Sequence, residues 1–504
     1  MSTPAFRVSY FRPLFFALTA SACGGVCLTT SACGESEPSS PAPSGASGST
    51  SVGGSASGAA TGGGAAGTAS AGGAAAGSTA AGTAGQSAGT GGSGGSGGTA
   101  GTASSGGSAG NATGGAGGAG GTGGAGGTGG GVPTTGTATR PLLTAEAAAG
   151  FTVAKYLEKA GPVTAPVADN WDPTAGVDIT SLTPTYRVAA TGGTDTTIQG
   201  AITKAVTAGG TARVAIEVAD GTYREVVCVP SAAPPITLYS KNPNASATRI
   251  VFDNYNGKPK DAQTPANPCN PALGDLTHGT SGSPTFAAYA AGFQAKNLTI
   301  ENDTDETGIT SNVQAVALAT QGDKQIYDNV RLLGNQDTFF VKSPNAATIT
   351  RVYVTKSFIQ GDTDFVFGRG TLVIDASEIH FVSSRQGSKG YPIVPSTDAR
   401  NPFGILVNKS KFTADAATTA SAVHLGRAWD ESGKDVATYA TLVASGVYPN
   451  GQAVIRESEL GAHVRLADPW APAATTSRPY SAVAGALPAN RLYEYANTGP
   501  GAAP

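Results

Sequence analysis

The chain has 504 residues, 73 of them glycine, and a formal net charge of −3 with only 13% charged residues. No basic stripe indicates nucleic-acid binding, and no run of like charge indicates a charged interaction tail. The glycines are concentrated in the first part of the chain, so the chain does not form a single globule.

The N-terminus has the layout of an export signal. Two arginines precede a short apolar run at residues 14–18, and small residues follow. The run is too weakly apolar for a stable membrane span, so it predicts a signal peptide. The segment Thr30–Gly34 resembles a bacterial lipoprotein processing site, although Thr30 stands where leucine is usual. We expect residues 1–33 to form the signal and Cys33 to carry a lipid; the alternative is plain secretion with cleavage nearby.

Residues 34–138 are almost only Gly, Ala, Ser and Thr. With nothing apolar enough to bury, such a segment cannot offset its own chain entropy. A collagen triple helix would need a strict three-residue period, which is absent. We therefore predict a disordered tether, with a random-coil span of roughly 55 Å, followed by a folded domain over residues 139–504.

Two helical patterns open the predicted domain. Residues 144–159 are rich in alanine, with partial helical spacing of their larger apolar residues. Ile198, Ala201, Ile202 and Ala205 repeat at helical spacing and are followed by a Gly-Gly stop. We expect this second helix to cap the open end of a β solenoid, which would otherwise expose strand edges.

Short β-rich runs then replace the helical signal, and an internal repeat becomes visible. A polar Asn or Ser, followed by β-forming residues, recurs in steps of 20 to 48 residues. This period predicts an all-β solenoid, a parallel β-helix in which equivalent coil positions stack as a ladder. A β-sandwich, the main alternative, would show turn signals every ~8–12 residues. The repeat positions are Asn297, Asn329, Ser357, Ser377, Ser410 and Ser458.

Two cysteines remain in the predicted domain, Cys228 and Cys269, which are 41 positions apart. An even count in an exported protein indicates a disulfide. Closing this loop would contribute on the order of a few kcal/mol. The alternative is a pair of buried thiols. No local Cys/His pattern accompanies either residue, so neither is a candidate nucleophile.

Glutamines and paired aspartates recur at coil spacing in the middle of the domain. Gln314 and Gln336 are 22 positions apart, and Asp337 and Asp364 are 27 apart. Neighbouring rungs of a parallel sheet lie ~4.8 Å apart, so these side chains would project from three successive rungs on one face. Two carboxylates at such a short distance from each other do not both ionise easily. One aspartate would then act as an acid and the other as a nucleophile or base, as hydrolysis requires.

The segments QAVAL (314–318), GNQDTFF (334–340), DFVFG (364–368) and LGRAW (425–429) resemble, in this order, the signatures of the pectin methylesterases. The resemblance extends over most of residues 190–502. It implies a right-handed parallel β-helix that hydrolyses methyl esters of pectin and releases methanol. It also implies that no metal or other cofactor takes part and that the polymer homogalacturonan is the partner.

The resemblance implies a role for each residue of these segments. Asp364 attacks the ester carbonyl, Asp337 protonates the leaving methanol and then activates water, and Arg427 keeps Asp364 ionised and oriented. Gln314 and Gln336 donate hydrogen bonds to the oxyanion. Arg427 follows Asp364 by 63 positions, so spacing alone does not place it in the site. The residues expected to line the sugar subsites are Trp429, Phe340 and Phe367.

Several positions depart from the usual family pattern. Asn335 replaces a common Tyr and Ala428 a common Pro, and with residues 368–370 they resemble the outer-membrane lipoprotein branch of the family. Some members of that branch act on other esters, so a lipoprotein esterase or acyl thioesterase is one alternative. A non-catalytic polysaccharide-binding β-helix is another. We expect a monomer at the cell surface or outer membrane, otherwise secreted, that meets the membrane only through its lipid.

Other hydrolytic and lytic chemistries fit the sequence less well. A pectate lyase needs a calcium-binding acidic cluster, and none is evident. A polygalacturonase uses aspartates one or two positions apart, as Asp362 and Asp364 are, but we interpret Asp362 as a solvated turn residue. The four histidines lack the G-x-S-x-G elbow of a serine esterase and are interpreted as structural.

Overall fold

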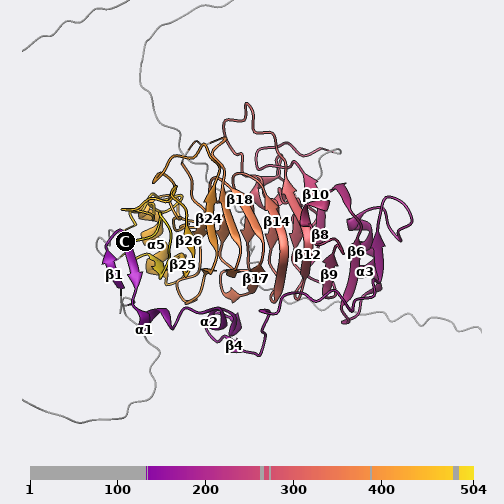
Figure 1. Cartoon of the computed structure of the whole chain (residues 1–504), viewed down its shortest axis with the longest axis horizontal. Helices are drawn as coiled ribbons and strands as arrows, with labels where there is room; N and C mark the ends of the chain where they lie inside the picture. The colour runs from indigo at the N-terminus through magenta and orange to yellow at the C-terminus, as the bar shows by residue number, and fades with distance from the viewer. Residues whose placement is uncertain are drawn as a thin grey trace, which may run out of the picture. The chain divides into compact units, whose positions relative to one another are not determined.

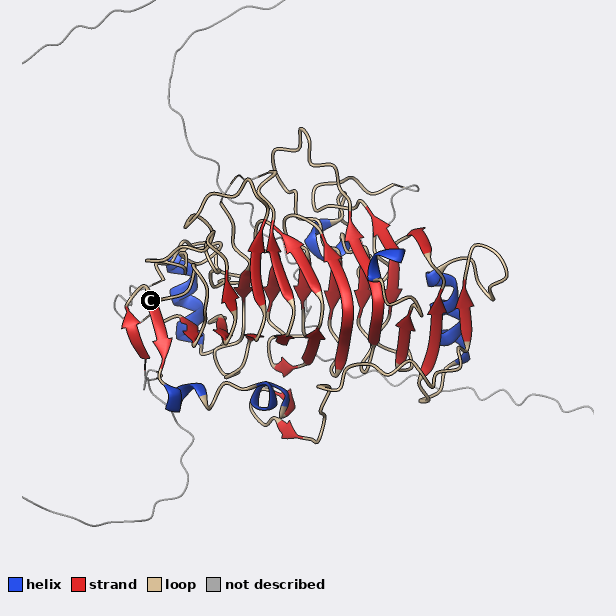
Figure 2. Cartoon of the chain, in the orientation of Figure 1, coloured by secondary structure: helices blue, strands red, loops and turns tan. Residues whose placement is uncertain are grey.

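The computed structural model describes the chain from residue 132 onward, apart from short gaps. The predicted signal segment with Cys33, and the predicted linker up to residue 131, lie outside the described residues. No helix within the described part is long and apolar enough to cross a membrane. The fold is the all-β, parallel β-helix that the sequence predicts (Figure 1, Figure 2). The described residues are 132, 134–261, 266–271, 274–385, 387, 389–480 and 487–504.

One side of the coils is a six-stranded sheet of short, fully buried strands. Each strand pairs in parallel with the equivalent strand of the next coil. The strands are β8 (Val227–Val229), β11 (Phe286–Ala288), β13 (Leu318–Thr320), β15 (Phe339–Val341), β19 (Val366–Gly368) and β22 (Ile393–Pro395). This sheet carries the candidate site.

A second sheet of 18 strands bends along one line, and β3 (Lys159–Pro162), β4 (Val167–Ala168) and β16 (Thr348–Ile349) form a small separate sheet. In its two longest strands the bend falls at Asn297 and Asn329, where φ is 59° and 51°. Before the bend lie β5 (Tyr186–Val188), β6 (Val214–Val218), β9 (Ile236–Tyr239), β12 (Gln294–Asn302), β14 (Gln325–Leu333), β17 (Arg351–Thr355), β20 (Thr371–Asp375), β23 (Ile405–Asn408), β25 (Gln452–Arg456) and β27 (Arg491–Tyr495). The last residues of β12 and β14 lie after the bend. So do the whole strands β7 (Gly221–Arg224), β10 (Thr248–Phe252), β18 (Phe358–Gly361), β21 (Glu378–Phe381), β24 (Lys411–Ala414) and β26 (Glu459–Leu460).

The repeated Asn and Ser residues form a hydrogen-bonded ladder at this bend. Asn329 Nδ2 donates to Asn297 Oδ1 at 2.8 Å. In the following coils a serine hydroxyl accepts from a backbone amide of the coil before, at 3.0 to 3.1 Å. The stacked repeat predicted from the sequence is thereby confirmed. The serines are Ser357, Ser377, Ser410 and Ser458.

Helix α3 (Ile198–Ala208) packs against the first coils, as predicted. Thr197 caps its N-terminus by accepting from the Gly200 amide at 3.1 Å, and Gly209 ends it with a positive φ of 66°. The four apolar residues at helical spacing are all fully buried in the main core. The helix therefore covers the apolar interior at the N-terminal end of the β-helix.

The segment before α3 crosses the outer face of the large sheet. The helical pattern at 144–159 forms two short helices, each capped by a threonine. They pack on the sheet in a second core that includes Tyr156, Leu157 and Tyr353. The paired strand β1 begins at residue 134, inside the predicted linker. These elements are β1 (Thr134–Thr137), β2 (Arg140–Leu143), α1 (Ala145–Ala148), α2 (Val153–Leu157), β3 (Lys159–Pro162) and β4 (Val167–Ala168).

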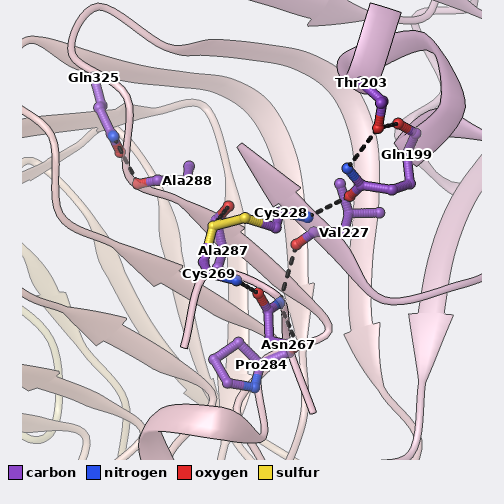
Figure 3. The surroundings of a disulfide bond; sticks show 10 residues. All are labelled: Gln199, Thr203, Val227, Cys228, Asn267, Cys269, Pro284, Ala287, Ala288 and Gln325. Atoms are coloured by element: carbon purple, nitrogen blue, oxygen red, sulfur yellow. Dashed lines mark hydrogen bonds between the residues drawn. A yellow bond between two sulfur atoms is a disulfide. The ribbon is translucent and has the colours of Figure 1, made fainter. Parts of the chain in front are cut away.

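A disulfide joins Cys228 of β8 to Cys269 in the loop that follows β10 (Figure 3). The same loop is tied to the coil by Asn267, whose Nδ2 donates to the carbonyl oxygens of Val227 and Pro284 at 3.0 Å. The loop is thus fixed to the first rungs of the six-stranded sheet. The remaining elements are η1 (Ala245–Ala247), α4 (Gly279–Gly282), β16 (Thr348–Ile349) and α5 (Val436–Ser445).

Candidate active site

The two predicted catalytic aspartates lie just before neighbouring strands of the six-stranded sheet. Phe339 of β15 is in register with Val366 of β19, so Asp337 and Asp364 each stand two residues ahead on adjacent rungs. Both adopt a left-handed backbone, with φ of 68° and 51°. The Asp337 amide donates to the Thr363 carbonyl oxygen at 3.0 Å, so the backbone pairing of β15 with β19 extends back to the two aspartates. Equal register and equal conformation place the two aspartates one rung, ~4.8 Å, apart along the sheet.

Arg427 reaches Asp364 from two rungs further along the β-helix. Its Nε and Nη2 donate to the two carboxylate oxygens at 2.9 and 2.7 Å. The neighbouring Gly426 pairs with Ile393 of β22, which explains how the long sequence separation closes. The guanidinium also lies 3.9 Å from the ring centroid of Tyr391. A bidentate pair of this kind fixes the orientation of the carboxylate.

The pKa of Arg427 shows which effect dominates at this pair. Burial alone would lower the pKa of the guanidinium, but the charge and hydrogen bonds of Asp364 raise it above its ordinary value. The charge of Asp337 adds to this rise. Arg427 is therefore a permanent cation facing both aspartates, and it stabilises negative charge in this part of the site.

The two glutamines flank the aspartates, and each has its amide oxygen engaged. Gln314 Oε1 accepts from Asn256 Nδ2 at 3.2 Å. Gln336 Oε1 accepts from Arg385 Nη2 at 3.4 Å. An amide whose oxygen is engaged has its NH2 group left to donate. The structure thus brings together two amide donors, two carboxylates and a guanidinium.

Three aromatic side chains lie beside the carboxylates on the outer face of the sheet. Phe340 and Phe367 are in register and stack at 4.3 Å between ring centroids. Trp429 packs on both, at 6.3 and 5.8 Å. The two phenylalanines are only 3% exposed, whereas Trp429 is half-buried. Trp429 is therefore the accessible ring of the three, and the phenylalanines support it from below.

The interpretation of Asp362 as a solvated turn residue is wrong. Its carboxylate is fully buried and accepts two hydrogen bonds from Arg385, at 2.8 and 2.7 Å. Arg385 Nε also lies 2.6 Å from a carboxylate oxygen of Glu306. Sequence reasoning missed Arg385 and Glu306 altogether. The one available signal was the spacing, because Arg385 follows Asp362 by 23 positions, about one coil.

The histidines do not belong to this set of carboxylates, amides and guanidinium groups. Burial lowers the pKa of His278, His424 and His463 to about 4, so these rings are neutral at physiological pH. His424 stacks on Tyr391 at 5.4 Å and so backs the ring that contacts the guanidinium. Within the described residues, no group of three or more His, Cys, Asp or Glu side chains is placed to hold a metal ion.

Residues 269–459 match the family model described as Pectinesterase. Together with the fold, this defines the protein as a carboxylic ester hydrolase built on a parallel β-helix. The chain is 46% identical over 372 residues to the pectinesterase of Ralstonia nicotianae, covering 73% of this chain and 92% of that protein. It therefore belongs to the pectinesterase family.

Two solved structures support the assignment of the fold. The rice weevil pectin methyl esterase superposes with a TM-score of 0.62 at 32% identity, covering 73% of this chain and all of that one (100%). Escherichia coli YbhC superposes with a TM-score of 0.62 at 30% identity, covering 73% of this chain and 96% of that one. The sequence of YbhC bears the name putative acyl-CoA thioester hydrolase.

Proposed function

We propose that the protein demethylesterifies pectin with Asp364 as nucleophile and Asp337 as general acid and base. The bidentate contact of Arg427 with Asp364, one rung from Asp337, carries this proposal. It leaves Asp364 as an oriented carboxylate, which is what a nucleophile needs. Relatives that bear the name pectinesterase support pectin as the substrate.

In the first step, an oxygen of Asp364 attacks the carbonyl carbon of the methyl ester. The carbonyl oxygen becomes an oxyanion, which the amide groups of Gln314 and Gln336 stabilise. One such donor is typically worth about 3 kcal/mol of the barrier. When the tetrahedral species collapses, the bond to the methoxy oxygen breaks. Asp337 gives its proton to that oxygen, so methanol leaves and an acyl–Asp364 anhydride remains.

In the second step, Asp337 is the base. It takes a proton from a water molecule, whose oxygen attacks the acyl carbon. Collapse of the second tetrahedral species breaks the bond to Asp364 and releases galacturonic acid, which loses its proton to solvent and becomes the carboxylate. Asp337 is again protonated and Asp364 ionised, so the cycle is complete.

Trp429 supplies the sugar contact in this proposal. Its half-buried ring stands on the stacked pair of Phe340 and Phe367, next to the rung of Asp364. An aromatic face packs against the C–H face of a pyranose ring, and a rigid support limits the entropy lost on binding. The Trp429 ring therefore sets where along the polymer the ester is presented.

The first measurement is methanol release from highly methylated pectin by the chain lacking residues 1–33. Asp364→Asn and Asp337→Asn should each reduce the rate by at least about 100-fold, because each removes one step of the cycle. Asp172→Asn is the matched control, since Asp172 bonds only its own turn at Thr174 in an exposed loop. A folded wild-type protein without methanol release would overturn the assignment to pectin.

The similarity to YbhC makes an acyl thioesterase the second candidate. The same acyl transfer would then release a thiol in place of methanol. Thiol release from acyl-CoA, measured with the same protein and the same variants, separates the two. Thiol release dependent on Asp364 without methanol release would favour the thioesterase.

We also propose that the protein is exported through residues 1–33 and anchored by a lipid on Cys33, with 34–131 as a tether, as in the outer-membrane lipoprotein branch. The apolar run, the Thr30–Gly34 sequence and the Gly/Ser-rich composition support this. Cys33→Ser should move the protein from the membrane fraction to the soluble exported fraction. Unchanged membrane association of this variant would contradict the lipid anchor.

A further inference from the structure

A buried ionic cluster of Glu306, Asp362 and Arg385 lies behind the candidate site. Arg385 binds both oxygens of Asp362, at 2.8 and 2.7 Å, and its Nε lies 2.6 Å from Glu306. The side chains are 18%, 0% and 7% exposed for Arg385, Asp362 and Glu306. Two carboxyl groups thus share one guanidinium, and removing any member would leave a buried polar group without its partner, which is costly.

Nη2 of Arg385, which binds Asp362, also lies close to two residues next to the candidate catalytic aspartates. Arg385 Nη2 lies 3.4 Å from Gln336 Oε1 and 3.4 Å from Thr363 Oγ1. Gln336 precedes Asp337, and Thr363 precedes Asp364. The guanidinium therefore contacts the residue before each of the two aspartates.

The protonation states of the cluster keep this contact in place. Burial raises the pKa of Glu306, and the charge of Arg385 opposes that rise. Burial would lower the pKa of Arg385, but Asp362 and Glu306 raise it above its ordinary value. Arg385 is thus a cation held between two carboxylates, and the Nη2 that donates to Asp362 also donates to the amide oxygen of Gln336 at 3.4 Å.

An amide side chain has two ends of nearly equal size, so sterics alone do not decide which end faces a substrate. Hydrogen bonds decide it. With Oε1 turned to the guanidinium, the Nε2 group of Gln336 is presented to the ester. In the opposite orientation Oε1 would face the oxyanion and repel it.

We propose that Arg385 is a positioning residue that acts through Gln336. It holds the amide oxygen so that the NH2 group is aimed at the oxyanion, and the pair with Asp362 and Glu306 holds Arg385. This inference rests on the proposed function, in which Gln336 is an oxyanion donor.

The test is a double-mutant cycle in methanol release, with Arg385→Met, Gln336→Ala and both together. Loss of one oxyanion donor typically costs about 100- to 1,000-fold in kcat. We expect Arg385→Met to lower kcat by about 10- to 100-fold with little change in KM. In the Gln336→Ala background, Arg385→Met should lower kcat by less than about 3-fold, because the amide that Arg385 positions is no longer present.

A matched control separates positioning from general damage. Arg140 forms a similarly buried bidentate pair with Glu494, 4% and 1% exposed, outside the site. Arg140→Met should lower Tm as Arg385→Met does, but leave kcat unchanged. Arg385→Lys, which keeps the charge, should fold and should recover part of the lost kcat.

Each outcome decides a different claim. If the factors by which the two substitutions lower kcat multiply in the double mutant, the positioning role is overturned and the proposed function stays intact. A rise in KM without a fall in kcat would mean the same. Full activity of Gln336→Ala would overturn the oxyanion role of Gln336 and this inference with it. If Arg385→Met does not fold, the cycle with Arg385→Lys gives the same comparison, and additivity there overturns the inference.

Discussion

Arg427 donates two hydrogen bonds to Asp364, although 63 positions separate them in the chain. The guanidinium lies over the ring of Tyr391, and that ring stacks on His424. The orientation of one carboxylate thus depends on side chains from the next two coils. A stiff solenoid suits this arrangement, because each rung fixes the position of the next.

The first prediction concerns this pair. Arg427→Lys retains the charge but cannot bind both oxygens of Asp364. We expect kcat for methanol release to fall by about 100-fold, with KM nearly unchanged, because orientation rather than charge is lost. Arg465→Lys is the control, since its pair with Asp468 is half-exposed and makes no contact with Asp364, so it should matter little. Full activity of Arg427→Lys would show that a nearby positive charge is sufficient.

The aromatic stack gives a second prediction. Trp429→Ala should raise KM by about 10-fold, the equivalent of about 1.4 kcal/mol of lost sugar contact. Phe367→Leu should instead lower the free energy of unfolding, by about 1–2 kcal/mol, because Phe367 is only 3% exposed and supports the tryptophan. Initial rates over a range of pectin concentrations and urea denaturation measure the two effects. An unchanged KM for Trp429→Ala would contradict its role as a sugar platform.

The disulfide gives a third prediction. Replacing Cys228 and Cys269 together by alanine opens a loop of 41 positions. The free energy of unfolding should fall by about 2–4 kcal/mol. Activity at 25 °C should persist, because β8 lies three strands from β15 in the six-stranded sheet. Wild-type protein under reducing conditions is the control and should match the variant; equal stability with and without the bond would contradict the prediction.

Sequence reasoning predicted the β-helix and its cap because both rest on local patterns. The Asn and Ser repeat is the ladder itself: the asparagines bond through their side chains, and each serine accepts from a buried backbone amide of the coil before. The spacing of the apolar residues in α3 likewise follows from one helix face meeting one core. The position of each aspartate before its strand followed from coil length.

Sequence reasoning did not predict contacts that depend on how loops return to the coils. Arg385 lies in the loop after β21, and no periodicity shows that its side chain reaches Asp362, Glu306 and Gln336. Asp362 was misinterpreted for the same reason, because an acidic residue in a turn is usually solvated. The burial of Phe340 beneath Trp429 also depends on a partner three coils away.

A fourth prediction follows from the buried histidines. Burial, with a smaller contribution from the charge of His380, lowers the pKa of His463 from 6.5 to about 4 in the folded protein. Between these two pH values the unfolded chain binds a proton at this site and the folded protein does not, so the free energy of unfolding falls as pH falls. His463→Gln removes this effect. Its stability relative to wild type should rise by about 2 kcal/mol from pH 7 to pH 4, as measured by denaturant unfolding; a constant difference would contradict the prediction.

The ladder serines give the last prediction. The Ser377 hydroxyl accepts from the Ser357 amide at 3.1 Å and donates to the Asp375 carbonyl oxygen at 2.8 Å, and the residue is buried. Ser377→Ala leaves that amide without a partner, so the free energy of unfolding should fall by about 1–3 kcal/mol. Ser445→Ala is the control, because Ser445 bonds only exposed backbone groups of Leu442 and Val447 at the end of α5 and should change stability by less than about 0.5 kcal/mol. Equal effects of the two variants in urea denaturation would mean that the ladder is a consequence of the coil rather than one of its supports.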